Sequence, residues 1–366
     1  MKHHAQFHRD RKPRASIAAV LIVKDEARCI ERCLNSIRPH VDRIVLLDTG
    51  STDGTQMLAA NCGAEVHHLP WPNDFSVARN HALDLADADW NLILDADEWI
   101  LSGGGLLRQW CKGRPRMGKI CVHSEVDGSN ETEAGSRRNW MTRLLPRGVR
   151  YEGRVHEQAI SDLPRLRLNL QVGHDGYLEH QLARKRDRNA PLLLADLKER
   201  PGDPYILYQL GKDCEMQGDL EGAAIRFGQS LEATAPEANW RHGLVIRQMR
   251  ALSKTGKRQE ALALADVEMP NWEDSPDFYF MVGNLLLDEA IDDPEQAVEQ
   301  WLPLAAGCWE RCLAIGERPD LEGSMQGCGS HLAKHNLTAV HTQMALHSAR
   351  RELARICDES VIDKDG

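Results

Sequence analysis

The N-terminal part of the chain alternates between short apolar runs and stretches with apolar residues at helical spacing. Residues 17–23 and 43–47 are largely apolar runs of strand length, and residues 65–68 and 92–94 are two further candidate strands. A continuously apolar run is typical of a strand that is covered on both faces. Between the first two runs, residues 27–38 show helical periodicity. The alternation predicts a parallel sheet built from right-handed βαβ units.

The pattern changes to short extended segments after this first part. Residues 119–123 and 140–145 are apolar enough for strands, and the polar segment 125–136 separates them. Segments of this length around a polar connection favour hairpin strands over helices. The sheet is therefore expected to be mixed rather than wholly parallel.

From about residue 181 onward the periodicity is helical throughout. Small residues recur at like positions, at Ala223, Ala261 and Ala297, each a few residues after a polar turn. Recurrence of this kind is typical of paired helices that stack as repeats. Residues 338–356 form one more candidate amphipathic helix. We therefore expect a tail at 1–14, an α/β domain at 15–180 and a helical domain at 181–366.

Carboxylates gather where three of the predicted strands end. Asp25 and Glu26 follow the first strand, Asp48 ends the second, and Asp95 and Asp97 follow the fourth. The carboxyl ends of parallel strands meet at one edge of a sheet, where open α/β sheets bind their ligands. Asp95 and Asp97 are two residues apart and can share one face. Hard oxygen ligands of this kind suit Mg²⁺ or Mn²⁺ with a phosphorylated substrate.

Composition and missing motifs narrow the choice of function. The formal net charge of −10 argues against a broad nucleic-acid surface. No dinucleotide-binding G-x-G-x-x-G follows the first strand, and no P-loop sequence occurs. No apolar run approaches the roughly 20 residues that span a bilayer, and the basic segment 1–14 lacks the apolar core of a signal peptide. Ten scattered cysteines without a C-x-x-C pair fit reduced thiols, so we expect a cytoplasmic protein.

Four motifs resemble family 2 glycosyltransferases of the GT-A fold. They are V-K-D-E from Val23, D-T-G-S-T-D-G-T from Asp48, F-S-V-A-R-N-H-A from Phe75 and L-D-A-D-E from Leu94. The resemblance covers these motifs in order and spacing, with one departure at Asp25, where many relatives carry Asn. It implies a nucleotide-sugar-binding, Rossmann-like GT-A domain.

The resemblance also implies residue roles. Asp48 and Asp53 would hold the nucleoside, Arg79 and Asn80 would reach the ribose or phosphate, Asp95 would contact the ribose, and Asp97 would ligate Mn²⁺ or Mg²⁺ and act in catalysis. The full set of nucleotide-binding residues implied by these motifs is Val23, Glu26, Asp48, Asp53, Arg79, Asn80, Asp95 and Ala96.

Two later motifs resemble the acceptor side of the same family. R-L-L-P-R from Arg143 precedes Y-E-G-R-V-H-E-Q from Tyr151. By resemblance, His156 would contact the metal or the diphosphate, and Glu157 would be the general base that takes the acceptor proton. His174 and Tyr177, in V-G-H-D-G-Y, match a further motif to which we assign no role.

The helical part resembles two or three degenerate tetratricopeptide repeats, through Gly211, Gly218, Ala223 and the closing Pro236. Such repeats present concave surfaces for a partner. They would dock an acceptor, buttress the catalytic domain or form a homo-oligomer surface, and the sequence leaves these alternatives open.

The function expected from these resemblances is inverting hexosyl transfer from a nucleotide-diphosphate sugar, most naturally a UDP-sugar, to a hydroxyl or thiol. The acceptor would be a protein or peptide docked by the repeats. One alternative is a glycolipid or lipopolysaccharide-core acceptor. An alternative of another class is a non-catalytic scaffold, in which the repeats recruit a partner. No nucleic-acid partner is expected.

Overall fold

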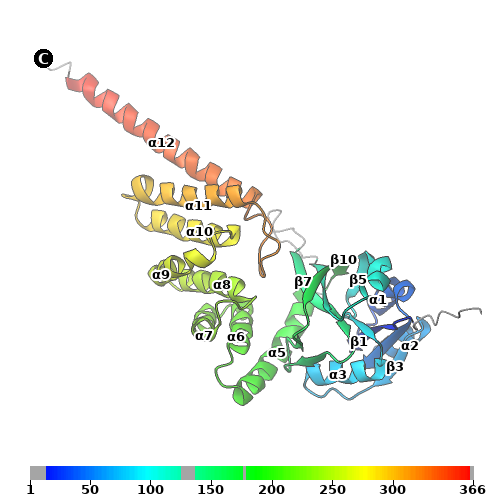
Figure 1. Cartoon of the computed structure of the whole chain (residues 1–366). Coiled ribbons are helices and arrows are strands. Elements are labelled where there is room, and N and C mark those ends of the chain that lie inside the picture. The colour runs from blue at the N-terminus through cyan, green and yellow to red at the C-terminus, as the bar shows by residue number, and fades with distance from the viewer. Residues whose placement is uncertain (1–13, 125–136, 176–178, 363–366) are drawn as a thin grey trace, which may run out of the picture. The chain divides into compact units, whose positions relative to one another are not determined.

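The computed structural model describes residues 14–124, 137–175 and 179–362. The chain forms two compact units, Met1–Leu182 and Ala183–Gly366, whose elements are labelled in Figure 1. Of the tail expected at 1–14, only Arg14 lies within the described residues, and the polar segment 125–136 and Tyr177 lie outside them.

The first unit begins with the alternation of strands and helices that the sequence predicts. In chain order the elements are β1 (Ile17–Val23), α1 (Ile30–Ile37), β2 (Arg43–Asp48), α2 (Thr55–Asn61), β3 (Glu65–His68), α3 (Phe75–Ala86), β4 (Trp90–Ile93) and β5 (Glu98–Ser102). Helix α1 starts later than residue 27, because the backbone N–H groups of Glu26 and Ala27 are used by the side chains of Thr55 and Asp53.

The remaining strands complete a mixed sheet. They are β6 (Met117–Ser124), β7 (Arg137–Pro146) and β10 (Arg165–His174), while β8 (Arg150–Glu152) and β9 (Gln158–Ile160) form a separate two-stranded sheet. The eight-stranded order is β3-β2-β1-β4-β7-β6-β10-β5. Strands β1 to β4 pair in parallel, and β7 pairs antiparallel with both β4 and β6. The α/β class with a mixed sheet and the antiparallel pairing of the two extended segments are confirmed.

Strand β1 shows why this sheet needs continuous apolar runs. Its odd-numbered residues, such as Leu21, pack in one core with α1 and α2, and its even-numbered residues, such as Val20, pack in a second core with α3. Successive side chains of a strand point to opposite faces, so a strand covered on both sides must be apolar at every position. The two cores fix the sheet edge at which β1, β2 and β4 end.

The second unit is helical. Its elements are α5 (Glu179–Glu199), which crosses the boundary between the units, and then α6 (Pro204–Gln217), α7 (Leu220–Ala233), α8 (Arg241–Lys254), α9 (Arg258–Glu268), α10 (Pro276–Asp292), α11 (Leu302–Ile315) and α12 (His331–Ile362). Within this unit, consecutive helices from α6 to α9 pack on each other, as do α10 with α11 and α11 with α12. None of the described helices is both long and apolar enough to cross a bilayer.

Small residues allow the paired helices to approach closely, as the repeat pattern predicts. A Cβ atom added at Gly211 of α6 would lie 2.4 Å from the ring of Phe227 on α7. Ala223 and Ala261 are fully buried in the core that α6 to α10 share. Ala297 lies instead in a π-helical turn before α11, so the third repeat departs most from the pattern. The helical class and the tetratricopeptide-like character of this unit are confirmed.

Candidate active site

The turns after β1 and β2 are locked together by their own polar side chains. The Asp25 N–H donates to Ser51 Oγ over 2.9 Å, and Asp25 Oδ1 accepts from the Thr52 N–H over 2.7 Å. Asp53 Oδ2 accepts from the Ala27 N–H over 2.9 Å. Asp25 has a φ of 55°, a region that Asp and Asn tolerate better than most residues. An Asp or an Asn is therefore suited to this position.

Asp48 lies at the end of β2, and only one of its two carboxylate oxygens accepts hydrogen bonds. Oδ1 accepts from the backbone N–H groups of Gly50 and Ser51 and from the Gln56 side chain. Burial tends to raise the pKa of Asp48, but the hydrogen bonds from Ser51, Gln56 and Gly50 outweigh it and hold the pKa below its usual value. Oδ2 is buried without a hydrogen-bond partner. A buried, ionised oxygen of this kind is suited to a ligand donor.

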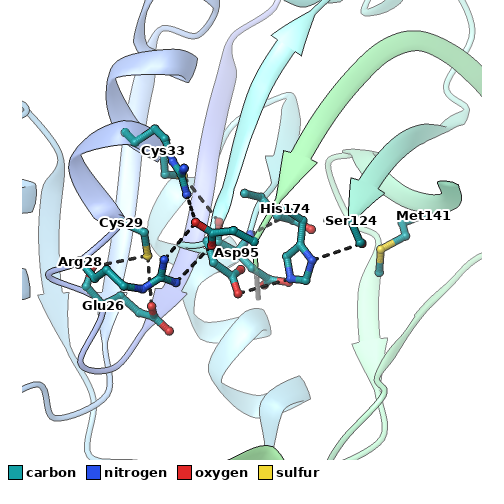
Figure 2. A network of polar contacts seen from close by, with 12 residues as sticks. Glu26, Arg28, Cys29, Cys33, Asp95, Ser124, Met141 and His174 are labelled. Carbon is teal, nitrogen blue, oxygen red and sulfur yellow. Dashed lines mark hydrogen bonds and ion pairs between the residues drawn. The ribbon is translucent and has the colours of Figure 1, made fainter. Parts of the chain in front are cut away.

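The other predicted nucleotide-binding residues, Val23, Glu26 and Ala96, lie at or just after the ends of β1 and β4, at the same edge of the sheet. The Val23 carbonyl accepts from the N–H of Thr49, and Ala96 is buried between the two aspartates of the D-x-D segment. The Glu26 carboxylate lies 3.2 Å from the Cys29 thiol, as Figure 2 shows. These residues shape the backbone at the strand ends.

Two buried arginines hold the carboxylates that follow β4. Arg79 Nη2 donates to Asp95 Oδ1 over 2.8 Å, and Arg79 Nε donates to Glu157. Arg143 Nη2 donates to Asp95 Oδ2 over 2.7 Å and to Glu98 Oε1 over 2.9 Å. The side chains of both arginines are less than a tenth exposed. The network brings three predicted site residues, Arg79, Asp95 and Glu157, into one cluster.

The network divides charge unequally between its two carboxylates after β4. Burial would raise the pKa of Asp95, but Arg143 and Arg79 together hold it well below its usual range. Glu98 is 2% exposed, and its burial, together with the charge of the neighbouring Asp95, outweighs the effect of Arg143, so the pKa of Glu98 is raised. Asp95 is therefore the more readily ionised of the two carboxyl groups. The Asp95 N–H also donates to Glu98 Oε2 over 2.9 Å, which fixes the turn.

Asn80 is used differently from Arg79, although the two are adjacent on α3. Its side-chain amide donates to the Tyr151 carbonyl and accepts from the Tyr151 N–H, both over 2.9 Å. This double contact ties α3 to β8, the strand that leads to Glu157. In this structure Asn80 anchors the segment that carries the candidate base.

Asp97 faces a histidine that comes from the far end of the unit. Asp97 Oδ2 lies 3.3 Å from Nε2 of His174, the last residue of β10, and both side chains are about one-eighth exposed. Nδ1 of the same imidazole lies 3.3 Å from Ser124 Oγ, so the ring sits between the D-x-D segment and β6 in Figure 2. His156, the predicted ligand, has a φ of 54°, and its carbonyl accepts from the Gln158 side chain.

The residue after His174 is clamped to α1. Asp175 accepts from Arg28 over 3.0 Å and from Arg32, and the guanidinium group of Arg32 lies 3.7 Å above the Trp99 ring. The Asp175 N–H also donates to the Asp97 carbonyl over 3.4 Å. Backbone and side-chain contacts thus hold the Asp97 segment and the end of β10 next to each other.

Several residues of this cluster went unassigned from the sequence. Arg143 is a charged residue within an apolar strand, and Glu98 directly follows the D-x-D segment and begins β5. A charge in such a position indicates a buried ion pair, so both residues could have been found from the sequence. His174 belongs to the V-G-H-D-G-Y motif, to which the sequence assigned no role, and Ser124 carried no local signal, because each residue ends a strand that pairs with a distant one.

The donor set beside Asp97 fits a metal that is shared with a substrate. In the part of the chain that the structure describes, no three Asp, Glu, His or Cys side chains form a complete metal cage. Mg²⁺ and similar ions, however, are commonly held by one or two protein groups and by substrate phosphates. One carboxylate and one imidazole are suited to that arrangement.

The sequence pattern of the family described as Glycosyl transferase family 2 matches residues 18–149, which hold all but the first residue of β1, the strands β2 to β7, and Arg79, Asp95 and Asp97, but not Glu157 or His174. This part of the chain is a family 2 glycosyltransferase domain. A TPR repeat-containing protein of Synechococcus elongatus is 32% identical over 248 residues, which are 63% of this chain and 60% of that protein. The prophage-derived glycosyltransferase SunS of Bacillus subtilis is 29% identical over 226 residues, 59% of this chain and 53% of SunS.

Both of these relatives are matched over less than two thirds of their own length. Among solved structures, glucosyl-3-phosphoglycerate synthase from Mycobacterium tuberculosis, in complex with Mn²⁺, uridine diphosphate and glucosyl-3-phosphoglycerate, is 26% identical. The structural match covers 31% of this chain and 45% of the synthase, with a TM-score of 0.25.

Proposed function

We propose that this glycosyltransferase domain transfers a sugar from a nucleotide-diphosphate sugar to a hydroxyl or thiol acceptor, with inversion at the anomeric carbon. The observation that carries the proposal is the meeting of Asp97 and His174 beside the arginine-bound Asp95. The acceptor oxygen or sulfur forms the new bond to the anomeric carbon while the bond to the nucleoside diphosphate breaks on the opposite face.

The part of the site that would bind the nucleotide sugar offers both hydrogen-bond acceptors and hydrogen-bond donors. The unpartnered Asp48 Oδ2 suits an N–H group of the base, and Arg79 Nη1 is a buried N–H donor without a partner, suited to a ribose or phosphate oxygen. Asp53, Val23, Glu26 and Ala96 would shape the walls around the nucleotide. These features support the predicted nucleotide-binding set.

Asp97 and His174 would hold the divalent cation. A bound Mn²⁺ or Mg²⁺ would stabilise the charge on the departing diphosphate. Asp97 presents a carboxylate oxygen and His174 presents Nε2 toward the same point. The prediction that His156 is a ligand stays a prediction, and it is tested beside His174 below.

Glu157 would accept the proton of the acceptor. Arg79 Nε donates to its carboxylate, which holds the side chain in place. The same arginine contacts Asp95, so the candidate base is placed one guanidinium group away from the donor side. A positioned general base contributes roughly 10² to 10⁴-fold to such a transfer.

The acceptor we propose is a protein or peptide bound by the helical unit. Stacked helix pairs present extended surfaces that bind such partners. Transfer to peptides, with the complete chain, should be compared with transfer to glycolipids, because a glycolipid acceptor would remove the role proposed for the repeats. The cytoplasmic location also stays a prediction.

Calorimetric titration with UDP, GDP and dTDP, with and without Mn²⁺, tests the donor site. Wild type should bind one nucleotide in a metal-dependent manner, and Asp97→Ala should lose this binding while keeping its melting temperature. Absence of binding for all three nucleotides would overturn the proposal in favour of a scaffold.

A second set of variants separates the two candidate histidine ligands. His174→Gln should weaken Mn²⁺-dependent nucleotide binding strongly, because Gln replaces the imidazole nitrogen beside Asp97. His156→Gln is the matched substitution at the other candidate. A large loss in His156→Gln with none in His174→Gln would reverse the assignment of the ligand.

A further inference from the structure

Ser124 and His174 are direct neighbours on adjacent parallel strands. The register of β6 and β10 pairs His174 with Ser124, and β10 also pairs His174 with Glu98 at the start of β5. Ser124 is 2% exposed, and its Oγ lies 3.3 Å from His174 Nδ1. The opposite ring nitrogen faces Asp97. The imidazole is therefore held at both nitrogens.

We propose that Ser124 is a positioning residue that sets the tautomer and orientation of His174 for cation binding. This inference rests on the proposed metal site of Asp97 and His174. When Nδ1–H donates to Ser124 Oγ, Nε2 keeps its lone pair and presents it beside the Asp97 carboxylate. Histidines that bind metals commonly donate their second N–H to such a partner, which orients the ring.

A serine hydroxyl suits this position because it both donates and accepts hydrogen bonds. Without a cation, Nε2–H can donate to Asp97 while the hydroxyl of Ser124 donates to Nδ1. With a cation, the proton moves to Nδ1 and the hydroxyl becomes the acceptor. The same pair of heavy atoms, 3.3 Å apart, serves both states. A carboxylate at position 124 would instead favour the doubly protonated ring, which binds no metal.

Burial makes the contact effective. Ser124 lies inside the sheet. Asp175, which follows His174 in the chain, is held by Arg28 and Arg32. The ring can rotate only about its own side-chain bonds, because the backbone on which it is carried is fixed. Loss of the hydroxyl therefore frees the ring and the tautomer without moving the strand.

The test measures Mn²⁺ affinity by calorimetry on the complete chain with UDP, GDP or dTDP present, because a diphosphate completes the proposed coordination shell. Ser124→Ala should bind Mn²⁺ about 10 to 100-fold more weakly, as is typical when a metal-binding histidine loses its hydrogen-bond partner. Ser124→Thr keeps the hydroxyl and should stay within about 3-fold of wild type, by the same reasoning. Ser102→Ala, at an exposed position on the adjacent part of β5, is the matched control and should bind as wild type does.

A second variant covers the case in which Ser124→Ala does not fold. Ser124→Cys preserves the side-chain size but replaces the hydroxyl with a weakly hydrogen-bonding thiol, and it should also lose Mn²⁺ affinity. Nitrogen chemical shifts of His174, assigned by comparison with His174→Gln, should show protonated Nδ1 in Mg²⁺-bound wild type and a mixture of tautomers in Ser124→Cys.

The outcomes separate this inference from the function on which it rests. Wild-type Mn²⁺ affinity in folded Ser124→Ala or Ser124→Cys, with Asp97→Ala defective, would overturn the role of Ser124 and leave the metal site standing. Absence of Mn²⁺ binding in wild type with each of UDP, GDP and dTDP present would overturn the metal site and the role of Ser124 together.

Discussion

Asp97 Oδ2 lies 3.3 Å from Nε2 of His174, across the junction of the D-x-D turn and the last long strand of the sheet. Asp97 lies near the middle of the sequence of the first unit and His174 near its end, and the two residues meet because β10 pairs with β5. Neither side chain alone makes a metal site. Together they make one half of a coordination shell that a diphosphate can complete.

Asp97→Asn should abolish sugar transfer and Mn²⁺-dependent nucleotide binding, since the amide removes the charge that holds the cation. The melting temperature should stay near that of wild type. Asp87→Asn, at an exposed position, is the matched control and should retain both activities. Transfer at the wild-type rate by Asp97→Asn would remove Asp97 from the catalytic set.

Glu157→Gln should slow transfer by roughly 10² to 10⁴-fold, because the amide cannot take the acceptor proton. Metal-dependent nucleotide binding should remain, since Asp97 and His174 are unchanged. Rates at saturating donor and acceptor, together with nucleotide calorimetry, check both halves of the prediction. Turnover as fast as that of wild type would exclude Glu157 as the base.

The sheet edge was predictable because its determinants are local. Each strand of the first half is an apolar run followed by its own polar turn, and parallel βαβ connections bring such turns to one edge. Asp48, Asp95 and Asp97 could therefore be grouped from the sequence. Their order in the chain was sufficient for that inference.

The partners of these carboxylates were not predictable in the same way. Arg143 reaches Asp95 because β7 returns antiparallel beside β4, and His174 reaches Asp97 because β10 lies between β6 and β5. A shift of one residue in either register would turn the side chain to the other face. Long-range registers of this kind leave no mark in the spacing of the sequence.

Arg79→Met should destabilise the glycosyltransferase domain by about 3 to 5 kcal/mol, because it leaves the buried Asp95 and Glu157 carboxylates with fewer partners. Arg150→Met is the matched control. Arg150 pairs with Asp84 at the surface, where such pairs contribute about 1 kcal/mol or less. Urea unfolding followed by tryptophan fluorescence measures both, and equal losses would show that the buried network does not stabilise the domain.

Gly211→Ala should destabilise the helical unit by about 1 to 3 kcal/mol, because the new methyl group would overlap the Phe227 ring between α6 and α7. Gly307→Ala is the matched substitution in α11, where an added Cβ meets nothing within 4 Å. It should be neutral or stabilise by up to about 1 kcal/mol. Thermal unfolding of the two variants checks the pair, and a stabilised Gly211→Ala would contradict the close packing of these helices.

Asp277→Asn should change how the stability of the helical unit depends on pH. Burial, only partly offset by the hydrogen bond from the Met325 N–H, raises the pKa of Asp277 from 3.8 to about 6. The folded protein thus holds this proton more tightly than the unfolded chain does. The resulting stabilisation is complete below about pH 4 and is lost as pH rises to about 6.

The asparagine variant lacks this titration. Its unfolding free energy relative to wild type should therefore rise by up to about 3 kcal/mol between pH 4 and 6 and stay constant above, at about 1.4 kcal/mol for each pKa unit. Asp266→Asn, on the exposed side of α9, is the control and should leave the pH dependence of wild type in place. Urea unfolding at a series of pH values measures the difference, and parallel curves for wild type and Asp277→Asn would contradict a raised pKa at this buried carboxyl.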